Sequence, residues 1–256
     1  MTVVATVGTT HPLAFAGLIF AALALEVEGV RPVCVVAGVS AQDAAHVLAR
    51  EALDPTTIRA QFDALRTAGV DAFHIGALLS TGAVRAVAAA LEAFPGVPVV
   101  VDPVLAASGG DALADDATRI ALRDVLVPRA TLVTPNLDEA TALLGHPVGD
   151  VAAMHEAAAA LVALGARAAL VKGGHLDGDP TDVLGDEGGT HELMSQRVSG
   201  ALRGTGDLLA VTIAACLAQG APLNEAIARA RHRVREAIAS GVMFAGARVT
   251  SHCGNQ

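Results

Sequence analysis

A glycine-rich turn followed by a single acid opens the stretch RGTGDLLAVTIAACLAQG, residues 203–220. Glycines let the backbone bend so that successive N–H groups point outward at the start of a helix, where the helix dipole and the unpaired donors favour anions. Asp207 at the same helix end could accept a proton from a substrate hydroxyl while the N–H groups of Gly204, Thr205 and Gly206 hold phosphoryl oxygens. The same residues also suit an ordinary turn into a buried helix, so the tetrapeptide alone leaves both interpretations open.

Two further acids stand where they could join this chemistry. Asp102 directly follows the apolar run VPVVV, where a buried carboxylate is costly unless it is paired or close to a metal ion. A helix cap or a turn is the alternative for Asp102. In TPNLDEATALLG, Asn136 ends a predicted strand and Glu139 falls on the first turn of the next helix, so both could face one crevice. An Asn cap with Glu at the third helical position would explain that pair without any catalytic role.

Short β-branched runs alternate with longer segments rich in alanine and leucine, and these must position the polar residues. We expect strands, apolar on both faces, at 3–7, 33–37, 70–76, 97–102, 131–136 and 168–174. Helices are expected between them, at 13–27, 56–68, 81–94, 112–126, 137–144 and 150–164. This alternation predicts an α/β fold with a doubly wound, mostly parallel sheet and helices on both faces. Beyond it we expect an antiparallel or edge strand at 190–198 and two helices at 207–219 and 222–239.

Glycine or polar residues follow each of the first six predicted strands. Ligands of open parallel sheets bind outside the carboxyl ends of the strands, so these positions carry more weight than similar residues elsewhere. Each could be a turn or a cap when taken alone, but together they predict one pocket. The residues in question are Gly8, Gln42 with its neighbours Ser40 and Asp43, Gly76, Asp102, Asn136, and the run Lys172 to His175.

Composition narrows the partners. The formal net charge is -9 and charged residues make up 17%, so the chain lacks the basic surface that binds nucleic acid through its phosphates. The apolar run at 13–25 is too short to span a bilayer and is followed by Glu26 and Glu28, which favours a buried helix and no membrane partner. Cys34, Cys216 and Cys253 are odd in number and far apart, as in a reducing cytoplasm, where we expect this protein.

Several common site types are missing from the sequence. It has neither a P-loop nor the third glycine of a dinucleotide fingerprint, and no zinc or serine-hydrolase motif. Four arginines on the last predicted helix favour a solvated face over an anion site; they are Arg229, Arg231, Arg233 and Arg235. No linker or repeat divides the chain, so we expect one domain over residues 1–256.

Four segments, in order, resemble the ribokinase-like superfamily, and within it the branch of hydroxymethylpyrimidine (phosphate) kinases and pyridoxal kinases. They are VVVDPVLAASGGDAL, LVTPNLDEATALLG, ALVKGGHLDG and GTGDLLAVTIAACLAQGAPLNEAI, and the resemblance runs from about residue 30 onward. It implies a kinase dependent on ATP and Mg²⁺ that phosphorylates a hydroxymethyl group on a small heteroaromatic ring, with hydroxymethylpyrimidine or its phosphate, in thiamine biosynthesis, as the leading substrate. A pyridoxal or pyridoxine kinase, or a non-catalytic paralogue that binds a small ligand, stays open. Dimers are common in the family, so a homodimer is open too.

The resemblance also implies roles for individual residues. Gly204, Thr205 and Gly206 would form the anion hole, and Asp207 would be the catalytic base. Asp102 and Glu139 would act on Mg²⁺, largely through water. The residues expected near the nucleotide are Asn136, Lys172, Gly174 and Thr205, and those expected near the substrate are Gly8, Gln42 and Gly76.

Departures from the family pattern gather at the substrate side. Hydroxymethylpyrimidine kinases usually carry cysteine where this chain has Asp207, an acid found in pyridoxal and sugar kinases. The N-terminal motif of the family becomes GTTHPLAFAGLIFAA, residues 8–22, so that its substrate-binding aspartate falls at or beside Ala21. Residues 43–56 also lack the usual flap sequence. The catalytic half therefore matches the family, while the substrate half is altered.

Overall fold

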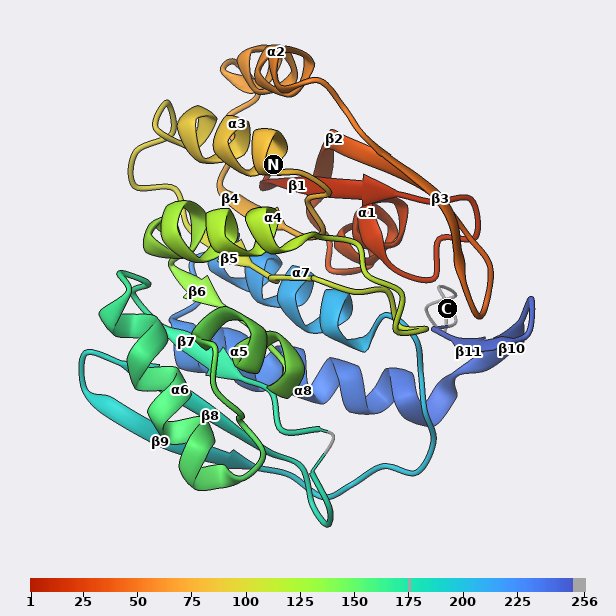
Figure 1. Cartoon of the computed structure of the whole chain (residues 1–256), viewed down its shortest axis with the longest axis vertical. Coiled ribbons are helices and arrows are strands. Elements are labelled where there is room, and N and C mark those ends of the chain that lie inside the picture. The colour runs from red at the N-terminus through yellow and green to blue at the C-terminus, as the bar shows by residue number, and fades with distance from the viewer. Residues whose placement is uncertain (175, 251–256) are drawn as a thin grey trace.

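The computed structural model describes residues 1–174 and 176–250, which leaves His175 and Cys253 outside the described residues. In this part of the chain the core is a nine-stranded sheet of order β3-β2-β1-β4-β5-β6-β7-β8-β9. Figure 1 shows the chain in a view down its shortest axis. Its strands are β1 (Val3–Thr10), β2 (Arg31–Gln42), β3 (Val47–Ala52), β4 (Ala72–Ile75), β5 (Val99–Val101), β6 (Leu132–Val133), β7 (Ala169–Val171), β8 (Thr181–Asp186) and β9 (Gly189–Met194). The six central strands β2, β1, β4, β5, β6 and β7 run parallel. At one edge β3 pairs antiparallel with β2, and at the other β8 pairs antiparallel with β7 and β9 with β8.

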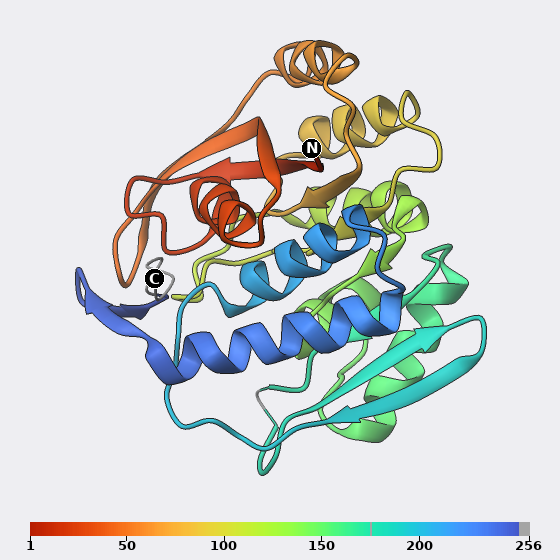
Figure 2. The ribbon, with the colours of Figure 1, turned by 180° about the vertical axis from the view of Figure 1, so that it is seen from behind.

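Helices cover both faces of this sheet (Figures 1 and 2). The helices are α1 (Gly17–Val27), α2 (Pro55–Leu65), α3 (Thr81–Leu91), α4 (Asp116–Ala121), α5 (Leu137–Leu144), α6 (Val151–Ala163), α7 (Thr205–Ala218) and α8 (Leu223–Ser240). A π-helical turn (Leu122–Leu126) and a 3-10 turn (Val127–Arg129) follow α4. One apolar cluster joins α1, α7 and α8 to the sheet, and another joins α2 to α6 to the opposite face.

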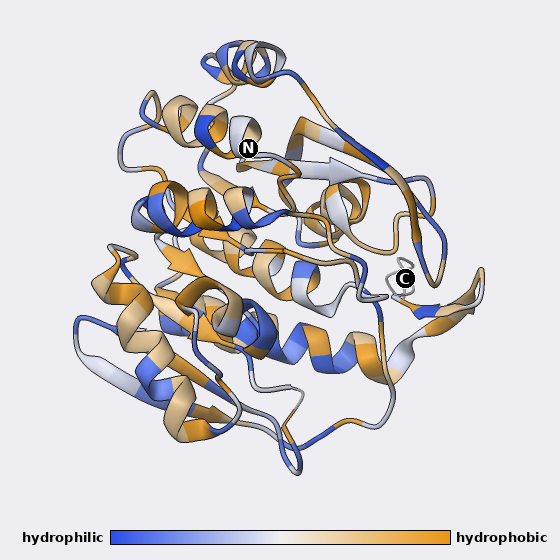
Figure 3. Cartoon of the chain, in the orientation of Figure 1, coloured by the Kyte–Doolittle hydropathy of each residue, from blue (hydrophilic) through white to orange (hydrophobic). Residues whose placement is uncertain are grey.

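The short central strands are apolar on both faces because both faces are covered. In β5, Val99 and Val101 enter the cluster under α2 to α6, and Val100 enters the one under α1, α7 and α8. Helix α8 lies at the outside and alternates apolar and polar segments along its length (Figure 3). Its buried residues Ala226, Ile227, Ala230 and Ala237 face the sheet side, as an amphipathic surface helix requires.

The predicted α/β class, with a mostly parallel sheet covered on both faces, is confirmed. The helix expected at 13–27 begins later, at Gly17, because Ala14 has a positive φ of 48° and Ala16 is extended. The helix expected at 112–126 is divided into α4 and the π-helical turn. Strands β3 and β8, and a C-terminal hairpin of β10 (Val242–Phe244) and β11 (Ala247–Val249), were not expected.

The apolar run at 13–25 and two of the cysteines lie in the described part of the chain. None of its helices combines the length and hydrophobicity needed to cross a membrane. The apolar run at 13–25 forms a loop followed by most of α1, whose buried residues are Leu18, Phe20, Ala21, Ala24 and Leu25. Cys34 is exposed and Cys216 is buried, and both are free thiols.

Candidate active site

Two adjoining cavities open at the carboxyl ends of the parallel strands, in front of the N-terminus of α7. Their volumes are about 420 Å³ and about 1030 Å³. Both are lined by Asn136, Lys172, Thr205 and Gly206, so these residues stand at the boundary between them. Asp102, Glu139 and Asp207 line the larger cavity. The segments singled out from the sequence therefore converge on one place.

The glycine turn shapes the boundary through its backbone. Gly204 precedes α7 with a φ of 78°, and a Cβ there would lie 2.4 Å from the carbonyl oxygen of Phe15, so only glycine fits. No side chain caps the start of α7, and its first N–H groups are left facing the cavities. Such a helix end binds anions well, phosphate oxygens above all.

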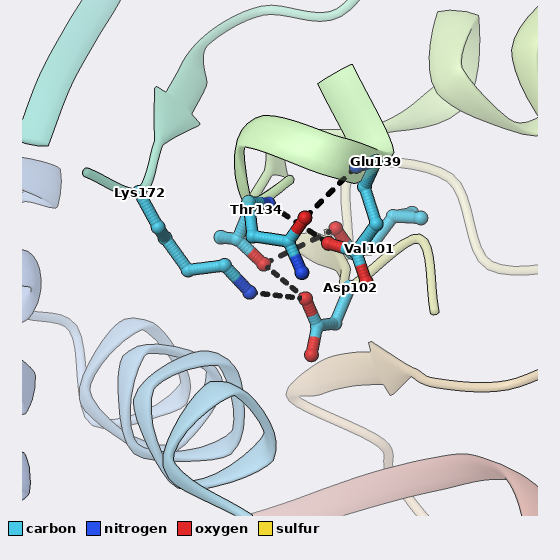
Figure 4. A network of polar contacts seen from close by, with 6 residues as sticks. Val101, Asp102, Thr134, Glu139 and Lys172 are labelled. Carbon is cyan, nitrogen blue, oxygen red and sulfur yellow. Dashed lines mark hydrogen bonds and ion pairs between the residues drawn. The ribbon is translucent and has the colours of Figure 1, made fainter. Parts of the chain in front are cut away.

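A buried ion pair stands beside this turn. The Nζ of Lys172 donates to Oδ1 of Asp102 at 2.9 Å, and the hydroxyl of Thr134 donates to the same oxygen at 3.0 Å. Figure 4 shows both side chains pointing toward Asp102 from neighbouring segments. Burial opposes the charge of Lys172, but the carboxylates of Asp102 and Glu139 outweigh it and raise the pKa of its ammonium group. The pair thus places a permanent cation at the boundary of the two cavities.

Asn136 and Glu139 form a capping box at the start of α5. Oδ1 of Asn136 accepts the N–H of Glu139 at 2.8 Å, and Oε2 of Glu139 accepts the N–H of Asn136 at 2.8 Å. The structural interpretation of this pair is therefore correct, yet Glu139 also lines the larger cavity while only 8% exposed. Burial raises its pKa to about 7, with Lys172 opposing and Asp102 adding to the rise. One side chain serves the helix end and the cavity together.

Asp207 lies on the first turn of α7 and is 8% exposed. Burial raises the pKa of its carboxyl to about 7; Asp102 adds to the rise, and a hydrogen bond from the N–H of Gly17 opposes it. Gly17 is the first residue of α1, with a φ of 74°, and a Cβ there would lie 2.6 Å from the carbonyl oxygen of Thr9. The N-termini of α1 and α7 therefore both meet at this carboxylate.

Among the side chains that line the larger cavity around Lys172, carboxylates outnumber basic groups, so the excess negative charge favours binding of a metal cation. Among the described residues, no three His, Cys, Asp or Glu side chains stand close enough to hold a metal ion directly. Mg²⁺ suits this donor set, because it keeps several of its waters and is commonly bound through one or two carboxylates together with substrate phosphates.

The residues predicted near a substrate are less closely gathered. Gly8 and Gly76 are neighbours: a Cβ on Gly8 would lie 3.7 Å from the backbone carbon of Gly76, and one on Gly76 would lie 3.8 Å from Oδ1 of Asp207. Gln42 lies apart on the β2–β3 hairpin, half-buried, and donates to the hydroxyl of Ser40 at 2.7 Å. None of Gly8, Gln42 and Gly76 lines either of the two cavities, whereas Gly174 lines the smaller one.

Arg231 lines the smaller cavity, although a solvated position was expected for it. Its Nε donates to Oδ2 of Asp182 at 2.8 Å, and both side chains are mostly buried at the smaller cavity. The solvated-face interpretation fails here because Arg231 follows Ile227 by four residues and precedes Val234 by three, on the apolar stripe of α8. This spacing of three and four residues from apolar neighbours could have indicated from the sequence that Arg231 faces the interior. Thr134 and His74 are also buried beside the site residues, but no pattern in the sequence around them indicates that position.

Comparison with known proteins agrees with this geometry. The family model of phosphomethylpyrimidine kinase matches residues 17–251. The chain is 42% identical over 207 residues to the thiamine biosynthesis bifunctional protein ThiED of Geobacter sulfurreducens, which covers 80% of this chain and 42% of that protein, so the chain spans less than half of it. It is 38% identical over 220 residues to the hydroxymethylpyrimidine/phosphomethylpyrimidine kinase of Streptomyces coelicolor, covering 85% of this chain and 81% of that one. Among solved structures, an ADP complex of Bacillus subtilis pyridoxal kinase superposes with a TM-score of 0.88 and 29% identity, covering 98% and 97% of the two chains.

Proposed function

Because the chain belongs to the phosphomethylpyrimidine kinase family, we propose that it transfers the γ-phosphoryl group of ATP to the hydroxymethyl group of a small heteroaromatic alcohol. Hydroxymethylpyrimidine or its phosphate, in thiamine biosynthesis, is the leading acceptor, as in the Streptomyces relative. The observation that carries the proposal is the placement of Asp207. A buried carboxylate directly behind a glycine turn, at the open end of α7, is what transfer to a hydroxyl needs.

Asp207 is the proposed base. In its ionised form the carboxylate accepts the proton of the hydroxymethyl group as the hydroxyl oxygen attacks the γ-phosphorus. The bond from that phosphorus to the β–γ bridging oxygen breaks, and ADP leaves. The N–H groups of Gly204, Thr205 and Gly206 face the phosphoryl oxygens and stabilise their charge during transfer.

Asp102 and Glu139 are the residues that would hold Mg²⁺, through water, and the ion when bound neutralises phosphate charge. Lys172 is kept charged by the same carboxylates and stands between the cavities, where it contacts phosphate. Thr134 and Lys172 both bind one oxygen of Asp102, which fixes the direction of this carboxylate.

The smaller cavity is the proposed nucleotide site. It is lined by Asn136, Lys172, Gly174 and Thr205, and its far wall holds Arg231 against Asp182. The ADP complex of the Bacillus subtilis relative supports nucleotide use by this fold. Because this cavity and the acidic one meet at Thr205 and Gly206, a nucleotide here directs its phosphates at the α7 N-terminus.

The acceptor is proposed to lie beside Gly8 and Gly76, below the β2–β3 hairpin that carries Gln42. Ala21, which stands near the position of the family's substrate-binding acid, is fully buried in the core cluster of α1 and cannot contact an acceptor. This loss, together with Asp207 and the likeness to pyridoxal kinase, keeps pyridoxal as the second candidate acceptor.

The deciding experiment supplies the purified protein with Mg-ATP and, separately, hydroxymethylpyrimidine, its phosphate and pyridoxal, and identifies products by mass spectrometry. A phosphorylated pyrimidine is the expected product, and Asp207→Ala is expected to abolish its formation while nucleotide binding persists. Product from pyridoxal alone would favour the second candidate. A nucleotide-induced rise in melting temperature without product from any alcohol would instead indicate a ligand-binding paralogue. The cytoplasmic location and the homodimer remain proposals, which fractionation and sedimentation would test.

A further inference from the structure

His74 is a buried imidazole for which the proposed mechanism has no use. It lies in the middle of the sheet on β4 and is 1% exposed. Its Nδ1 and the hydroxyl of Thr6 are 3.0 Å apart, which pairs one ring nitrogen. The other, Nε2, has no hydrogen-bond partner among the described residues. An unpaired buried polar atom costs free energy, so a water molecule or a substrate group is the expected partner of Nε2.

Gly76 connects this imidazole to the proposed base. It follows His74 by two residues, just past the end of β4, where its N–H still pairs with the carbonyl oxygen of Val7, so both positions point to the same side of the sheet. A Cβ at Gly76 would lie 3.7 Å from Cε1 of His74 and 3.8 Å from Oδ1 of Asp207. The missing side chain of Gly76 therefore leaves a space of about methyl size, with the imidazole on one side and the carboxylate on the other.

The charges around His74 favour one form of the ring. Burial lowers its pKa to about 4, with Asp102 opposing and Lys172 adding to the fall, so the ring is neutral near pH 7. A neutral ring carries its proton on one nitrogen. The Thr6 hydroxyl can donate to Nδ1, and in that tautomer the proton of the ring lies on Nε2.

We propose that His74 is a positioning residue for Asp207. Its Nε2–H donates, through a water molecule in the space beside Gly76, to the Asp207 carboxylate and holds it in the direction of the acceptor hydroxyl. No proton is transferred by the imidazole. This role rests on the proposed function, in which Asp207 is the base.

Two substitutions separate this role from a structural one. His74→Asn keeps a group near Nδ1 that can meet Thr6 but removes the Nε2 donor, whereas His74→Gln places an amide N–H close to the Nε2 position. We expect His74→Asn to lower kcat roughly 10–100-fold, the scale of a misplaced catalytic group. The KM for ATP should change by less than about twofold, and His74→Gln should restore most of kcat. Equal losses in both variants would overturn the proposal, as would an unchanged kcat in His74→Asn.

Gly76→Ala provides a variant that should fold. Its φ is not positive and no atom lies closer than 3.7 Å to the added Cβ, yet the methyl group fills the space that the water needs. It should lower kcat by a similar factor, and wild-type kcat would contradict the water bridge. Thr212→Val is the control, because Thr212 is equally buried with an unpaired hydroxyl but lies in the middle of α7. It should keep wild-type kcat.

A measurement without turnover keeps this inference separate from the proposed function. Nitrogen NMR of ¹⁵N-histidine-labelled, ligand-free protein should show a neutral ring with the proton on Nε2, assigned to His74 by its absence in His74→Asn. Its Nε2 resonance should shift in Asp207→Asn. A proton on Nδ1, or no response to Asp207→Asn, would overturn the positioning role even if no acceptor is phosphorylated; absent turnover in wild-type protein would contradict only the proposed function.

Discussion

Asp207 shows how a residue can serve chemistry at the expense of stability. Its carboxyl is almost fully buried. Burial and the charge of Asp102 oppose its ionisation, and the N–H of Gly17 and the ammonium group of Lys172 only partly offset them. A charge kept under such conditions is costly in the folded state and available for proton transfer. Removing it should therefore raise stability while it lowers activity.

The contribution of Asp207 to folding stability depends on pH. The pKa of Asp207 is about 7 in the folded protein and near 3.8 when exposed, so between these values the folded state holds a proton that the unfolded state releases. Stability contributed by this group is present below about pH 4 and is lost as pH rises to about 7. His74 acts in the opposite direction between about pH 4 and 6.5, since its pKa is lowered. Comparison with a variant isolates Asp207.

Asp207→Asn should leave stability near pH 4 almost unchanged and raise it increasingly up to about pH 7. For a chain of this size each kcal/mol corresponds to roughly 2–4 °C in Tm. The measurement is thermal unfolding of ligand-free protein from pH 4 to 8, with kcat, expected to fall roughly 10²–10⁴-fold, measured beside it. Asp63→Asn, an exposed residue on α2, is the control. A Tm difference that does not grow with pH would contradict the burial of a charged Asp207.

At the residue scale, the sequence predicted which side chains would lie together where these residues follow a strand. Asp102, Asn136 and Lys172 each follow a strand, and strand order alone brings them to one edge of the sheet. Thr134 and His74 could not be assigned this way, because their roles depend on which side chains from other strands lie beside them. A buried Thr or His within an apolar run carries no local sign of its partner.

At the scale of elements, α5 joins a structural and a chemical function. Its capping box was a competing explanation for Asn136 and Glu139, and the structure contains it alongside the cavity position of Glu139. The two functions depend on different properties of one side chain. The cap needs an oxygen acceptor, which glutamine also provides, whereas a cation site needs the negative charge.

Glu139→Gln should therefore retain the cap and lose the charge. We expect unfolding stability at or above that of the wild type near pH 8, and activity lower by roughly 10–100-fold, the scale seen for groups that support a metal. Glu139→Ala should in addition lose on the order of 1 kcal/mol of stability with the cap. Thermal unfolding and an Mg²⁺ titration of kcat separate the two. Full activity in Glu139→Gln would leave Glu139 a purely structural residue.

The central parallel strands were predictable from their runs of β-branched residues, whereas β8 was not expected although five of its six residues are buried. The runs VVATV and VPVVV lie under helices on both faces and were found within a few residues of their bounds. In β3, four of the six residues are exposed, and its sequence VLAREA has neither alternation nor an apolar run. Its pairing with β2 comes from the hairpin, a tertiary contact that local pattern does not encode.

At the scale of the whole molecule, segments from distant parts of the chain meet above the site. The tip of the β2–β3 hairpin lies beside the C-terminal hairpin of β10 and β11 (Figures 1 and 2). The guanidinium of Arg203, next to the glycine turn, donates to the carbonyl oxygen of Ala44 in that tip. Oδ2 of Asp111, after β5, accepts the N–H of Val47 at 2.7 Å. The hairpin is thus fastened to the segments that carry the acids and the anion hole.

A substitution at Asp111 tests the contact between the β2–β3 hairpin and the segment after β5. Val47 pairs directly with Gln42, so the hydrogen bond to Asp111 sets the position of the strand that we propose lies over the acceptor. Asp111→Ala removes one hydrogen bond, worth about 0.5–1.5 kcal/mol, and should raise the KM for the acceptor about 2–10-fold while the KM for ATP stays constant.

Asp111→Asn distinguishes the hydrogen bond from the charge. Its amide oxygen can still accept the N–H of Val47, but the ion pair of Asp111 with His46, at 3.6 Å and largely exposed, is lost. Since exposed pairs contribute little, this variant should keep the wild-type KM for the acceptor, as should Asp63→Ala on α2. If Asp111→Asn raised the KM as much as Asp111→Ala, the charge would be responsible. If neither did, the hairpin would hold its position over the acceptor through Arg203 and the C-terminal hairpin without Asp111.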